Sequence, residues 1–471
     1  MSFNLVIIGA GPGGYSAAIR ARQLGANVVL IEKDQPGGTC LNRGCIPSKI
    51  MRRTADVARE VHEAGTFGVA GDASAFEVRM DMLRARQKKV VDGQVMGLAK
   101  HFKALGINLV KGTASIEAAG SVKVVNAEGA EEKFAYDHLL IATGSVPTSL
   151  PGLEIDGQKI ISSDQALWME EKPQTLLVVG GGVIGCELAQ IFHDFGVKVT
   201  LVEGLGRLLP LPGLDEEISK NYMRCLKKIK LPFLTGQTLA GVKDSPGGIT
   251  ATIKPFSGEG EAKEMEFDQI LVSIGRKAAI DGLGLETLGV TCDPRGWIEV
   301  DDNYRTKAAN VWAIGDCLGP PKIMLAHVAT AEAMAAVENM MGGSRTVNYD
   351  HVPSAVFTTP EIGSVGLTLI QAEERFPGSR ASDFLFRQLG KAQAMGETDG
   401  LVRLVTGPDG RVLGGHILGA SATSLIAEVA VAVSKGLTAD DLANTIHAHP
   451  TLPEGIWEAA LSAAGRPLHG A

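Results

Sequence analysis

Two cysteines, Cys40 and Cys45, are separated by four residues in the stretch GGTCLNRGCIPSK (37–49). A thiol pair that closes a disulfide stores two electrons, because a thiolate attacks one sulfur while the other sulfur leaves. A zinc site needs about four ligands, and no second close group of Cys or His lies near Cys40. The pair therefore predicts redox chemistry without a metal, and the alternative is two unbonded cysteines of a core.

The segment 4–32 is the first element that must position this pair. An apolar strand, a glycine-rich turn, a helix and a second apolar strand follow one another and end on an acid. The glycines in G-x-G-x-x-G spacing and the acid are Gly9, Gly11, Gly14 and Glu32. Such glycines let the backbone turn and approach a pyrophosphate at a helix N-terminus, and the acid accepts hydrogen bonds from ribose hydroxyls. The segment thus predicts a dinucleotide site.

Residues 175–203 repeat the same unit. The corresponding glycines and acid are Gly180, Gly182, Gly185 and Glu203, with the same spacing from the first glycine to the acid. One such fingerprint is weak evidence, because the chain contains 58 glycines. Two copies, each with strand, glycines, helix, strand and acid in order, strongly predict two dinucleotide sites.

The thiol pair favours a flavin at the first site, because a flavin accepts electrons from a thiolate and passes hydride to a nicotinamide. The second site is then expected to take the nicotinamide cofactor. Glu203 would repel the 2′-phosphate of NADP and suits the free 2′-hydroxyl of NAD. Only Arg207 follows it closely, and no basic cluster does. We therefore expect a flavin and NAD.

The bulk composition fits a multidomain globular protein. The chain has 471 residues, 45% hydrophobic and 21% charged, with a net charge of −8. The charge gives no reason to expect nucleic acid, and neither a signal peptide nor a long apolar stretch suggests a membrane, so we expect a cytoplasmic protein. Four further cysteines are scattered singly and are expected to be small buried hydrophobic residues: Cys186, Cys225, Cys292 and Cys317.

The ordered motifs resemble those of the flavin disulfide reductases, a class of pyridine nucleotide-disulfide oxidoreductases, and most closely those of the members that oxidise dihydrolipoamide. The resemblance spans nearly the whole chain. Its motifs are GAGPGG (9–14), GGTCLNRGCIPSK (37–49), LLIATGS (139–145), GGGVIGCE (180–187), VWAIGDC (311–317), MLAH (324–327) and HAHPTLPE (447–454). One departure is Ala279, in GRKAA (275–279), where the family usually has Asn.

The resemblance implies an α/β fold with two Rossmann-like domains and a C-terminal α+β dimerisation domain. The FAD-binding domain would occupy 1–150 and the NAD-binding domain 151–276. A central segment, 277–347, would complete the FAD domain, and 348–471 would form the interface of a homodimer. In the family each active site is built from both chains.

The resemblance also implies roles for the residues near the thiols. Cys40 would be the interchange thiol, and Cys45, at the start of a helix, the charge-transfer thiol that contacts the flavin. Lys49 would lie near the flavin N5 and pair with Glu187, where a cation stabilises developing negative charge. We also expect Arg43, between the two cysteines, to depress a thiol pKa.

The C-terminal motif supplies a histidine for proton transfer. His449 is the expected acid–base, because histidine titrates in the useful range, and Glu454 would orient it. An alternative is that Glu454 only caps a helix, since Thr451 and Glu454 have the spacing of a capping box with Pro453 early in the helix. For His447 we expect a packing or hydrogen-bonding role.

The resemblance completes the set of cofactor contacts. The FAD site is expected to include residues of the first fingerprint, of the redox motif and of the later FAD motifs: Gly9, Gly11, Gly14, Glu32, Thr39, Lys49, Thr143, Gly144, Asp316 and Ala326. The NAD site is expected to include Gly180, Gly182, Gly185, Glu203 and Gly275. Because residue 279 is Ala where the family usually has Asn, we expect no polar contact from this side chain.

Together these features predict an enzyme that oxidises dihydrolipoamide, or the lipoyl domain of a carrier protein, with NAD⁺. Such an enzyme would serve a 2-oxoacid dehydrogenase or glycine cleavage complex. One alternative is an NAD(P)H-dependent reductase of another disulfide, such as glutathione disulfide, although Glu203 disfavours NADPH. A mercuric reductase would carry cysteines near its C-terminus, whereas the last cysteine here is Cys317. A non-enzymatic redox subunit would not need His449.

Overall fold

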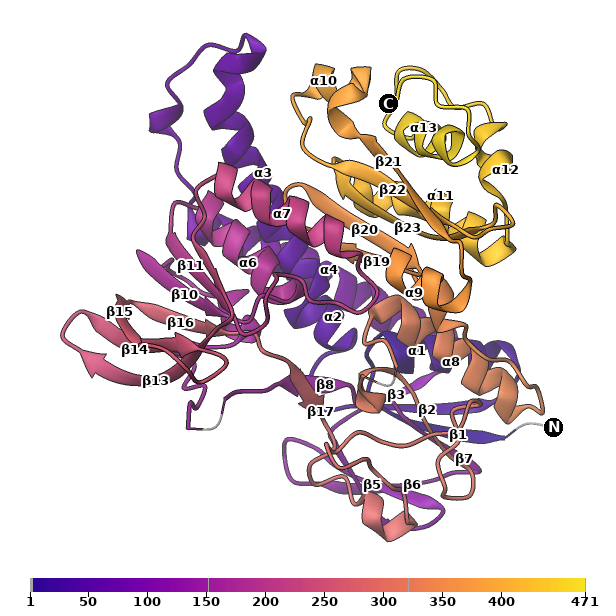
Figure 1. Ribbon diagram of the computed structural model, residues 1–471. Helices are drawn as coiled ribbons and strands as arrows, with labels where there is room; N and C mark the ends of the chain where they lie inside the picture. The colour runs from indigo at the N-terminus through magenta and orange to yellow at the C-terminus, as the bar shows by residue number, and fades with distance from the viewer. Residues whose placement is uncertain (1–2, 151, 321, 471) are drawn as a thin grey trace.

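The computed structural model describes residues 3–150, 152–320 and 322–470. Its first sheet is parallel throughout and has the strand order β18-β7-β1-β2-β3. These strands are β1 (Asn4–Ile8), β2 (Asn27–Glu32), β3 (Asn108–Lys111), β7 (His138–Ile141) and β18 (Val311–Ala313). The short apolar runs read as strands because a parallel sheet is covered on both faces. β18 comes from far along the chain and forms the edge of this sheet beside β7, and Figure 1 shows β7, β1, β2 and β3 at the lower right.

The second sheet repeats this arrangement. Its order is β12-β11-β10-β16-β9, again parallel throughout. The strands are β9 (Ile160–Ile161), β10 (Thr175–Val179), β11 (Lys198–Glu203), β12 (Phe233–Thr235) and β16 (Gln269–Val272). β10 and β11 take the places that β1 and β2 have in the first sheet. The two predicted Rossmann-like domains are therefore present.

The repeat extends to a small antiparallel sheet in each domain. One consists of β4 (Thr113–Ala118), β5 (Ser121–Val125) and β6 (Glu131–Ala135), and the other of β13 (Gln237–Ser245), β14 (Gly248–Pro255) and β15 (Lys263–Phe267). Between the domains, β8 (Ser145–Pro147) pairs with β17 (Arg276–Ala278) in an antiparallel ribbon. This ribbon joins the segment that follows β7 of the first sheet to the segment that follows β16 of the second sheet.

The C-terminal domain is built on a different sheet, antiparallel and in the order β19-β20-β23-β22-β21. Its strands are β19 (Ser354–Val356), β20 (Glu361–Gly366), β21 (Arg380–Leu385), β22 (Leu401–Thr406) and β23 (Val412–Gly419). α11 (Ala422–Lys435) packs on β20 and β23, and α13 (Glu454–Ala463) packs on β21 and β22. This agrees with the predicted α+β class.

Helices cover the sheets and carry the site residues. The remaining α-helices are α1 (Pro12–Gln23), α2 (Gly38–Arg43), α3 (Cys45–Glu63), α4 (Met80–Ala104), α5 (Ser163–Ala166), α6 (Val183–Asp194), α7 (Glu216–Lys228), α8 (Ala326–Met340), α9 (Leu369–Arg375), α10 (Gly390–Met395) and α12 (Ala439–Ala443). The short 3₁₀ helices are η1 (Ala64–Phe67), η2 (Ala73–Ala75), η3 (Leu285–Leu288), η4 (Gly315–Leu318), η5 (Tyr349–His351) and η6 (Phe386–Gln388).

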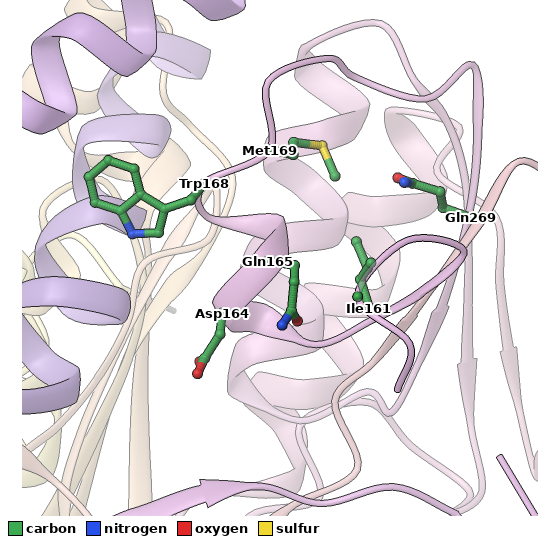
Figure 2. A pocket seen from close by; sticks show the side chains of 7 residues that line it. Ile161, Asp164, Gln165, Trp168, Met169 and Gln269 are labelled. Atoms are coloured by element: carbon green, nitrogen blue, oxygen red, sulfur yellow. The ribbon is translucent and has the colours of Figure 1, made fainter. Parts of the chain in front are cut away.

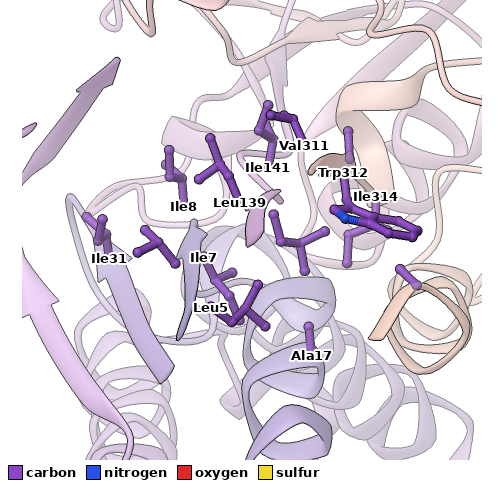
Figure 3. Packing of buried hydrophobic residues seen from close by; sticks show 14 of the residues in the cluster. Leu5, Ile7, Ile8, Ala17, Ile31, Leu139, Ile141, Val311, Trp312 and Ile314 are labelled. Atoms are coloured by element: carbon purple, nitrogen blue, oxygen red, sulfur yellow. The ribbon is translucent and has the colours of Figure 1, made fainter. Parts of the chain in front are cut away.

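The largest core lies between the first sheet and the helices beside it. Figure 3 shows Ile7 of β1, Leu139 of β7 and Trp312 of β18 among the side chains of this core, with Ala17 of α1 nearby. All four side chains are buried. Burial of such side chains stabilises the fold by about 1.5–3 kcal/mol for each large apolar residue, so the strand that returns from residue 311 is firmly anchored.

The scattered cysteines follow the prediction only in part. Cys186 and Cys317 are buried, whereas Cys225 is half-buried and Cys292 is exposed. The prediction of a buried hydrophobic residue was therefore wrong for Cys292, which follows a turn-rich surface segment rather than a strand of the core. The described residues contain no group of three or more His, Cys, Asp or Glu that could hold a metal ion.

Candidate active site

The predicted redox pair lies where two helices meet. Cys40 is inside α2, and Cys45 is the first residue of α3, as predicted. Gly44 separates the helices, and a Cβ there would lie only 2.9 Å from the Thr39 carbonyl oxygen. Both thiols are free, and the Cys40 thiol donates a hydrogen bond to the Cys45 sulfur. The two thiols are therefore close enough to interact directly.

The two thiols have opposite acidities. The hydrogen bond from Cys40 and the charge of Lys49 outweigh burial and lower the pKa of Cys45 to about 7. Donation of the same hydrogen bond, together with burial, raises the pKa of Cys40 far above its usual value. A cysteine at a helix N-terminus also gains from the helix dipole. Cys45 is therefore the more acidic thiol of the pair and is the first to form a thiolate.

This asymmetry predicts a pH profile for alkylation. In the reduced protein, the rate of alkylation of Cys45 by iodoacetamide should rise with a midpoint near pH 7 and level off above about pH 8, because only the thiolate reacts. Lys49→Met should move the midpoint upward, since the cation that favours the thiolate is lost. Mass spectrometry of the Cys45 peptide measures both. A midpoint near 9, the ordinary thiol value, would contradict the structure.

Lys49 connects the redox helix to two other parts of the chain. Its Nζ lies 2.9 Å from Glu187 Oε2 and 4.1 Å from the centre of the Phe357 ring. The other Glu187 oxygen, Oε1, accepts a hydrogen bond of 2.9 Å from the Phe357 backbone N–H. α3, α6 and the loop after β19 thus meet at one buried carboxylate, and the predicted contact between Lys49 and Glu187 is present.

Arg43 does not have the predicted effect on the thiols. Its guanidinium forms an ion pair with Asp34, in the loop after β2. The cation that lowers the Cys45 pKa is Lys49, one helical turn after Cys45. The prediction for Arg43 was wrong because position between two cysteines says nothing about the direction of the side chain.

The two fingerprints have nearly the same geometry. A Cβ at Gly14 would lie 1.8 Å from the Gly9 carbonyl oxygen, and a Cβ at Gly185 would lie 1.8 Å from that of Gly180. Gly9 and Gly180 have positive φ angles of 103° and 107°. Gly9 and Gly180 therefore require glycine because of their φ angles. Gly14 and Gly185 require it because helix and strand approach closely there.

The acids that close the two units also correspond. Glu32 accepts hydrogen bonds from the backbone N–H groups of Ala10 and Asp34, at 2.8 and 2.9 Å. Glu203 accepts them from Gly181 and Leu205, at 2.7 and 2.8 Å. Each carboxylate is thereby held against its own glycine turn, where a ribose would lie.

His449 and Glu454 are in contact in the C-terminal domain. His449 Nδ1 lies 2.8 Å from Glu454 Oε1, and the histidine side chain is 76% exposed. The other oxygen, Oε2, accepts a hydrogen bond of 2.8 Å from the Thr451 backbone N–H. Glu454 therefore fixes both the imidazole and the chain before α13.

The capping box predicted as the alternative is only half formed. α13 begins at Glu454 with Pro453 as its N-cap, and the Thr451 hydroxyl donates to the Ala448 carbonyl oxygen instead of accepting from the helix. His447 has the expected supporting role. Its ring nitrogens lie 2.8 Å from Glu428 Oε1 and 2.9 Å from the Thr445 carbonyl oxygen.

Within one chain, His449 and the cysteines belong to separate parts. Figure 1 shows α13 in the upper part of the C-terminal domain and α2 well below it. The structure brings Cys40, Cys45, Lys49 and Glu187 together but leaves the pair of His449 and Glu454 on the surface of another domain.

Comparison with known proteins identifies the family. The model of the pyridine nucleotide-disulphide oxidoreductases matches residues 3–333, and the model of their dimerisation domain matches residues 352–460. The chain belongs to this family. Pyridine nucleotide-disulphide oxidoreductases of this kind use FAD and NAD(H), as predicted.

Individual relatives agree along the full length. The chain is 40% identical to a dihydrolipoyl dehydrogenase of Bacillus subtilis over 99% of both chains, and 40% identical to one of Haloferax volcanii over 99% of this chain and 97% of that protein. Among solved structures, LpdA from Mycobacterium tuberculosis has a TM-score of 0.89 at 27% identity, covering 98% of this chain and 99% of that chain. RclA from Escherichia coli, at 24% identity, has the same fold with a TM-score of 0.85, covering 98% and 99%.

The residues present fit the two cofactors of the family. The middle glycines of the fingerprints face open space, since a Cβ at Gly182 would have no atom within 4 Å and one at Gly11 only the Gly38 Cα at 3.9 Å. A pyrophosphate can approach the backbone at both places. Thr143 Oγ1, in the predicted FAD site, is buried and has no hydrogen-bond partner in the described residues. It is free to bind a cofactor atom.

A matched pair of glycine variants tests this assignment. Gly185→Ala should lower the free energy of unfolding by about 1–3 kcal/mol, because the Cβ of the new alanine would overlap the Gly180 carbonyl oxygen. Gly182→Ala, at φ −75°, should melt like the wild type but raise the KM for NAD⁺ about tenfold, because its methyl group would lie where the pyrophosphate approaches. Thermal unfolding and NAD⁺ titration measure the two effects. Unchanged NAD⁺ binding by Gly182→Ala would exclude this pyrophosphate site.

The later FAD motifs are held by contacts that the sequence did not reveal. Asp316, in η4, accepts a hydrogen bond of 2.8 Å from Ser145 Oγ. Arg276 in turn donates to Ser145 Oγ at 2.6 Å and to the Ser145 carbonyl oxygen at 2.7 Å. The ribbon of β8 and β17 thus orders Asp316. The only sequence signal was the position of Arg276 directly after Gly275.

The other predicted cofactor residues lie around these elements. Thr39 is partly buried in α2, Ala326 begins α8, and Gly144 and Gly275 have φ angles of 72° and 144°. Arg207 does not extend toward a ribose, because its guanidinium donates to the carbonyl oxygens of Leu209 and Leu211 at 3.2 and 3.3 Å.

None of the helices in the described ranges is long and apolar enough to cross a membrane.

Proposed function

We propose that this oxidoreductase is a dihydrolipoyl dehydrogenase, which oxidises dihydrolipoamide with NAD⁺. The observation that carries the proposal is the thiol pair itself: Cys40 in α2 and Cys45 at the start of α3 interact, and Lys49, held by Glu187, lies one helical turn after Cys45. Such a pair suits exchange with a substrate dithiol at neutral pH. The names and full-length similarity of the curated relatives support the same substrate.

The chemistry of the cysteines follows from their asymmetry. In the oxidised enzyme, a substrate thiolate attacks the Cys40 sulfur, the bond between Cys40 and Cys45 breaks, and Cys45 leaves as a thiolate. The second substrate thiolate then attacks the sulfur that is bound to Cys40. This releases the cyclic disulfide of lipoamide and leaves both enzyme cysteines reduced. In this reduced pair Cys45 is the more acidic thiol, so Cys40 is the one that keeps its proton.

The remaining groups support these steps. His449 takes a proton from the substrate thiol, and Glu454, in contact with Nδ1, orients the ring and stabilises its charged form. The residues around the first fingerprint would hold FAD, which when bound would supply the chemistry that links a thiolate to a nicotinamide. Lys49, held by Glu187, provides positive charge beside the thiolate and the flavin site. The fingerprint glycines and acids bind and orient the two nucleotides.

We infer that the enzyme is a homodimer in which His449 serves the cysteines of the partner chain. The dimerisation-domain match over residues 352–460 supports this inference, and so does the exposure of His449, which precedes α13, a helix that Figure 1 shows well away from α2. We assign 1–150 and 277–347 to the FAD domain, 151–276 to the NAD domain and 348–471 to the interface. The return of β18 to the first sheet supports the first assignment. The partner would be the lipoyl domain of a 2-oxoacid dehydrogenase or glycine cleavage complex.

The nucleotide choice separates this reaction from an NADPH-dependent disulfide reductase. A 2′-phosphate would meet the carboxylate of Glu203, and Arg207 is held by backbone carbonyl oxygens instead of facing it. We therefore expect NAD⁺ to be preferred over NADP⁺ at least about tenfold in kcat/KM, since a buried like charge costs more than 1.4 kcal/mol.

The test is a steady-state assay of the FAD-loaded protein. Dihydrolipoamide with NAD⁺ should be oxidised, and lipoamide with NADH reduced, far faster than glutathione disulfide is reduced by NADH or NADPH. No turnover of dihydrolipoamide would falsify the proposal. Efficient reduction of another disulfide would assign the same thiol pair to a different substrate.

A further inference from the structure

The backbone on both sides of Cys45 is held by two side chains that none of the steps above uses. Trp168 Nε1 donates a hydrogen bond of 2.8 Å to the Asn42 carbonyl oxygen, three residues before Cys45. Gln87 Nε2 donates one of 3.2 Å to the Pro47 carbonyl oxygen, two residues after it. Gln87 is fully buried. The charge-transfer cysteine therefore lies between two anchored peptide groups.

The Asn42 carbonyl needs an external donor. α2 ends at Arg43, and the last carbonyl groups of a helix have no partner within the helix. The indole N–H of Trp168 satisfies this one. The Asn42 side chain is fixed as well, since its Nδ2 donates to the carbonyl oxygens of Gly38 and Pro36 at 3.0 and 3.1 Å. The end of α2 is thus tied both to its own beginning and to Trp168.

Trp168 is itself held by α4. The Leu167 carbonyl oxygen accepts hydrogen bonds from Gln87 Nε2 at 3.1 Å and from the Arg84 guanidinium at 2.5 Å. That guanidinium also lies 5.6 Å from the centre of the Trp168 ring. Burial lowers the pKa of Arg84 to about 10, so the group stays charged at neutral pH. The anchor is therefore a packed cluster rather than an isolated hydrogen bond.

The cluster also connects the redox pair to the second dinucleotide domain. Trp168 follows α5, and α5 packs on β9 and β16 of the second sheet. A cavity of about 360 Å³ lies beside α5 and has Trp168 among its lining residues. Figure 2 shows the indole pointing away from Met169 and Gln269, toward the helices of the first domain. Its polar end is thus directed at α2.

We propose that Trp168 and Gln87 are positioning residues of the redox pair, which hold the backbone around Cys45 so that its sulfur stays beside Cys40 and Lys49. The inference rests on the redox role proposed for the two cysteines. It does not depend on which dithiol they oxidise. Loss of either anchor should weaken the contacts that stabilise the Cys45 thiolate and the reduced pair.

The test compares Trp168→Phe with Trp457→Phe in the FAD-loaded protein. Trp457 is a matched control, because its Nε1 also donates one hydrogen bond, of 2.9 Å, to a carbonyl oxygen, that of Ala443 in the C-terminal domain. Two readouts are used: the pH midpoint of Cys45 alkylation, and the equilibrium of the cysteine pair with a dithiothreitol redox buffer. Neither readout requires turnover.

Trp168→Phe should raise the alkylation midpoint by about 0.4–1 pH unit, as expected for one lost hydrogen bond. It should shift the equilibrium toward the disulfide about three- to tenfold, and tenfold corresponds to about 30 mV. Gln87→Met, which keeps the length of the side chain but removes the donor, should shift both in the same direction. Trp457→Phe should leave both at the wild-type values.

Wild-type values in both Trp168→Phe and Gln87→Met would overturn the proposal, and so would an equal shift in Trp457→Phe. Circular dichroism and thermal melting establish folding, and if Trp168→Phe does not fold, Gln87→Met decides the question. If the wild type does not oxidise dihydrolipoamide but the anchor variants still shift Cys45, the proposed function fails and this inference stands.

Discussion

Replacement of Cys45 by serine should reduce oxidation of dihydrolipoamide by NAD⁺ at least about a thousandfold, and replacement of Cys40 should do the same. Neither variant can form the disulfide that receives the electron pair. The two losses have different causes. Cys40→Ser removes the sulfur that the substrate attacks, whereas Cys45→Ser removes the leaving thiolate, whose pKa of about 7 suits it for departure at neutral pH. Steady-state turnover of the purified, FAD-loaded variants measures both.

Cys292→Ser is the matched control for these variants. Cys292 is the other exposed cysteine of the described chain, and it pairs with Ile298 in an isolated bridge rather than with any redox residue. Its replacement should leave turnover within about twofold of the wild type, because ordinary surface substitutions have small effects. If either Cys40→Ser or Cys45→Ser kept a tenth of the wild-type rate, the electrons would have to take another route.

The sequence predicted the dinucleotide units well because their requirements are local. The overlap of a Cβ at Gly14 with Gly9, or at Gly185 with Gly180, is fixed by residues five positions apart. Strand, turn and helix are then specified within about thirty residues. The same holds for the N-terminus of α3, which begins at Cys45 as expected.

Contacts between distant segments were beyond local patterns. Phe357 contacts Lys49 across more than half of the chain and Glu187 across 170 residues, and Ser145 joins Arg276 to Asp316 between two domains. No spacing rule predicts such contacts, because they depend on how whole domains pack. The resemblance to a family did predict the contact of Lys49 with Glu187, since there the motif carries information about the fold.

Arg43 and Glu454 show a second limit, the direction of a side chain. Arg43 has the right charge and position for a thiol, yet it forms an ion pair with Asp34. For Glu454 the two predicted roles, orienting His449 and capping a helix, were treated as alternatives, but the residue makes a contact of each kind. A carboxylate has two oxygens, and here one contacts His449 while the other accepts from the Thr451 backbone N–H.

The second large effect is expected at His449. Replacement by glutamine should lower kcat for dihydrolipoamide about 10²–10⁴-fold, the usual contribution of a general base. Glu454→Gln should cost less, because the imidazole remains but loses the carboxylate that stabilises its charged form. His447→Gln is the control, since His447 contacts Glu428 and a backbone carbonyl and has no proton to transfer in the proposed steps. Measurement of kcat for the three variants over a range of pH distinguishes loss of the base from loss of the carboxylate that orients it.

A mixture of two inactive variants tests whether His449 serves the partner chain. Homodimers of Cys40→Ser and of His449→Gln each have two defective sites. In a hybrid dimer, a site shared between chains would combine the intact Cys40 of one chain with the intact His449 of the other. Equal mixing and reassociation should then restore about one quarter of wild-type activity, because half of the dimers are hybrids with one complete site. No recovery in a mixture proven to contain hybrids would place His449 and Cys40 of the same chain in one site, or would remove His449 from the reaction.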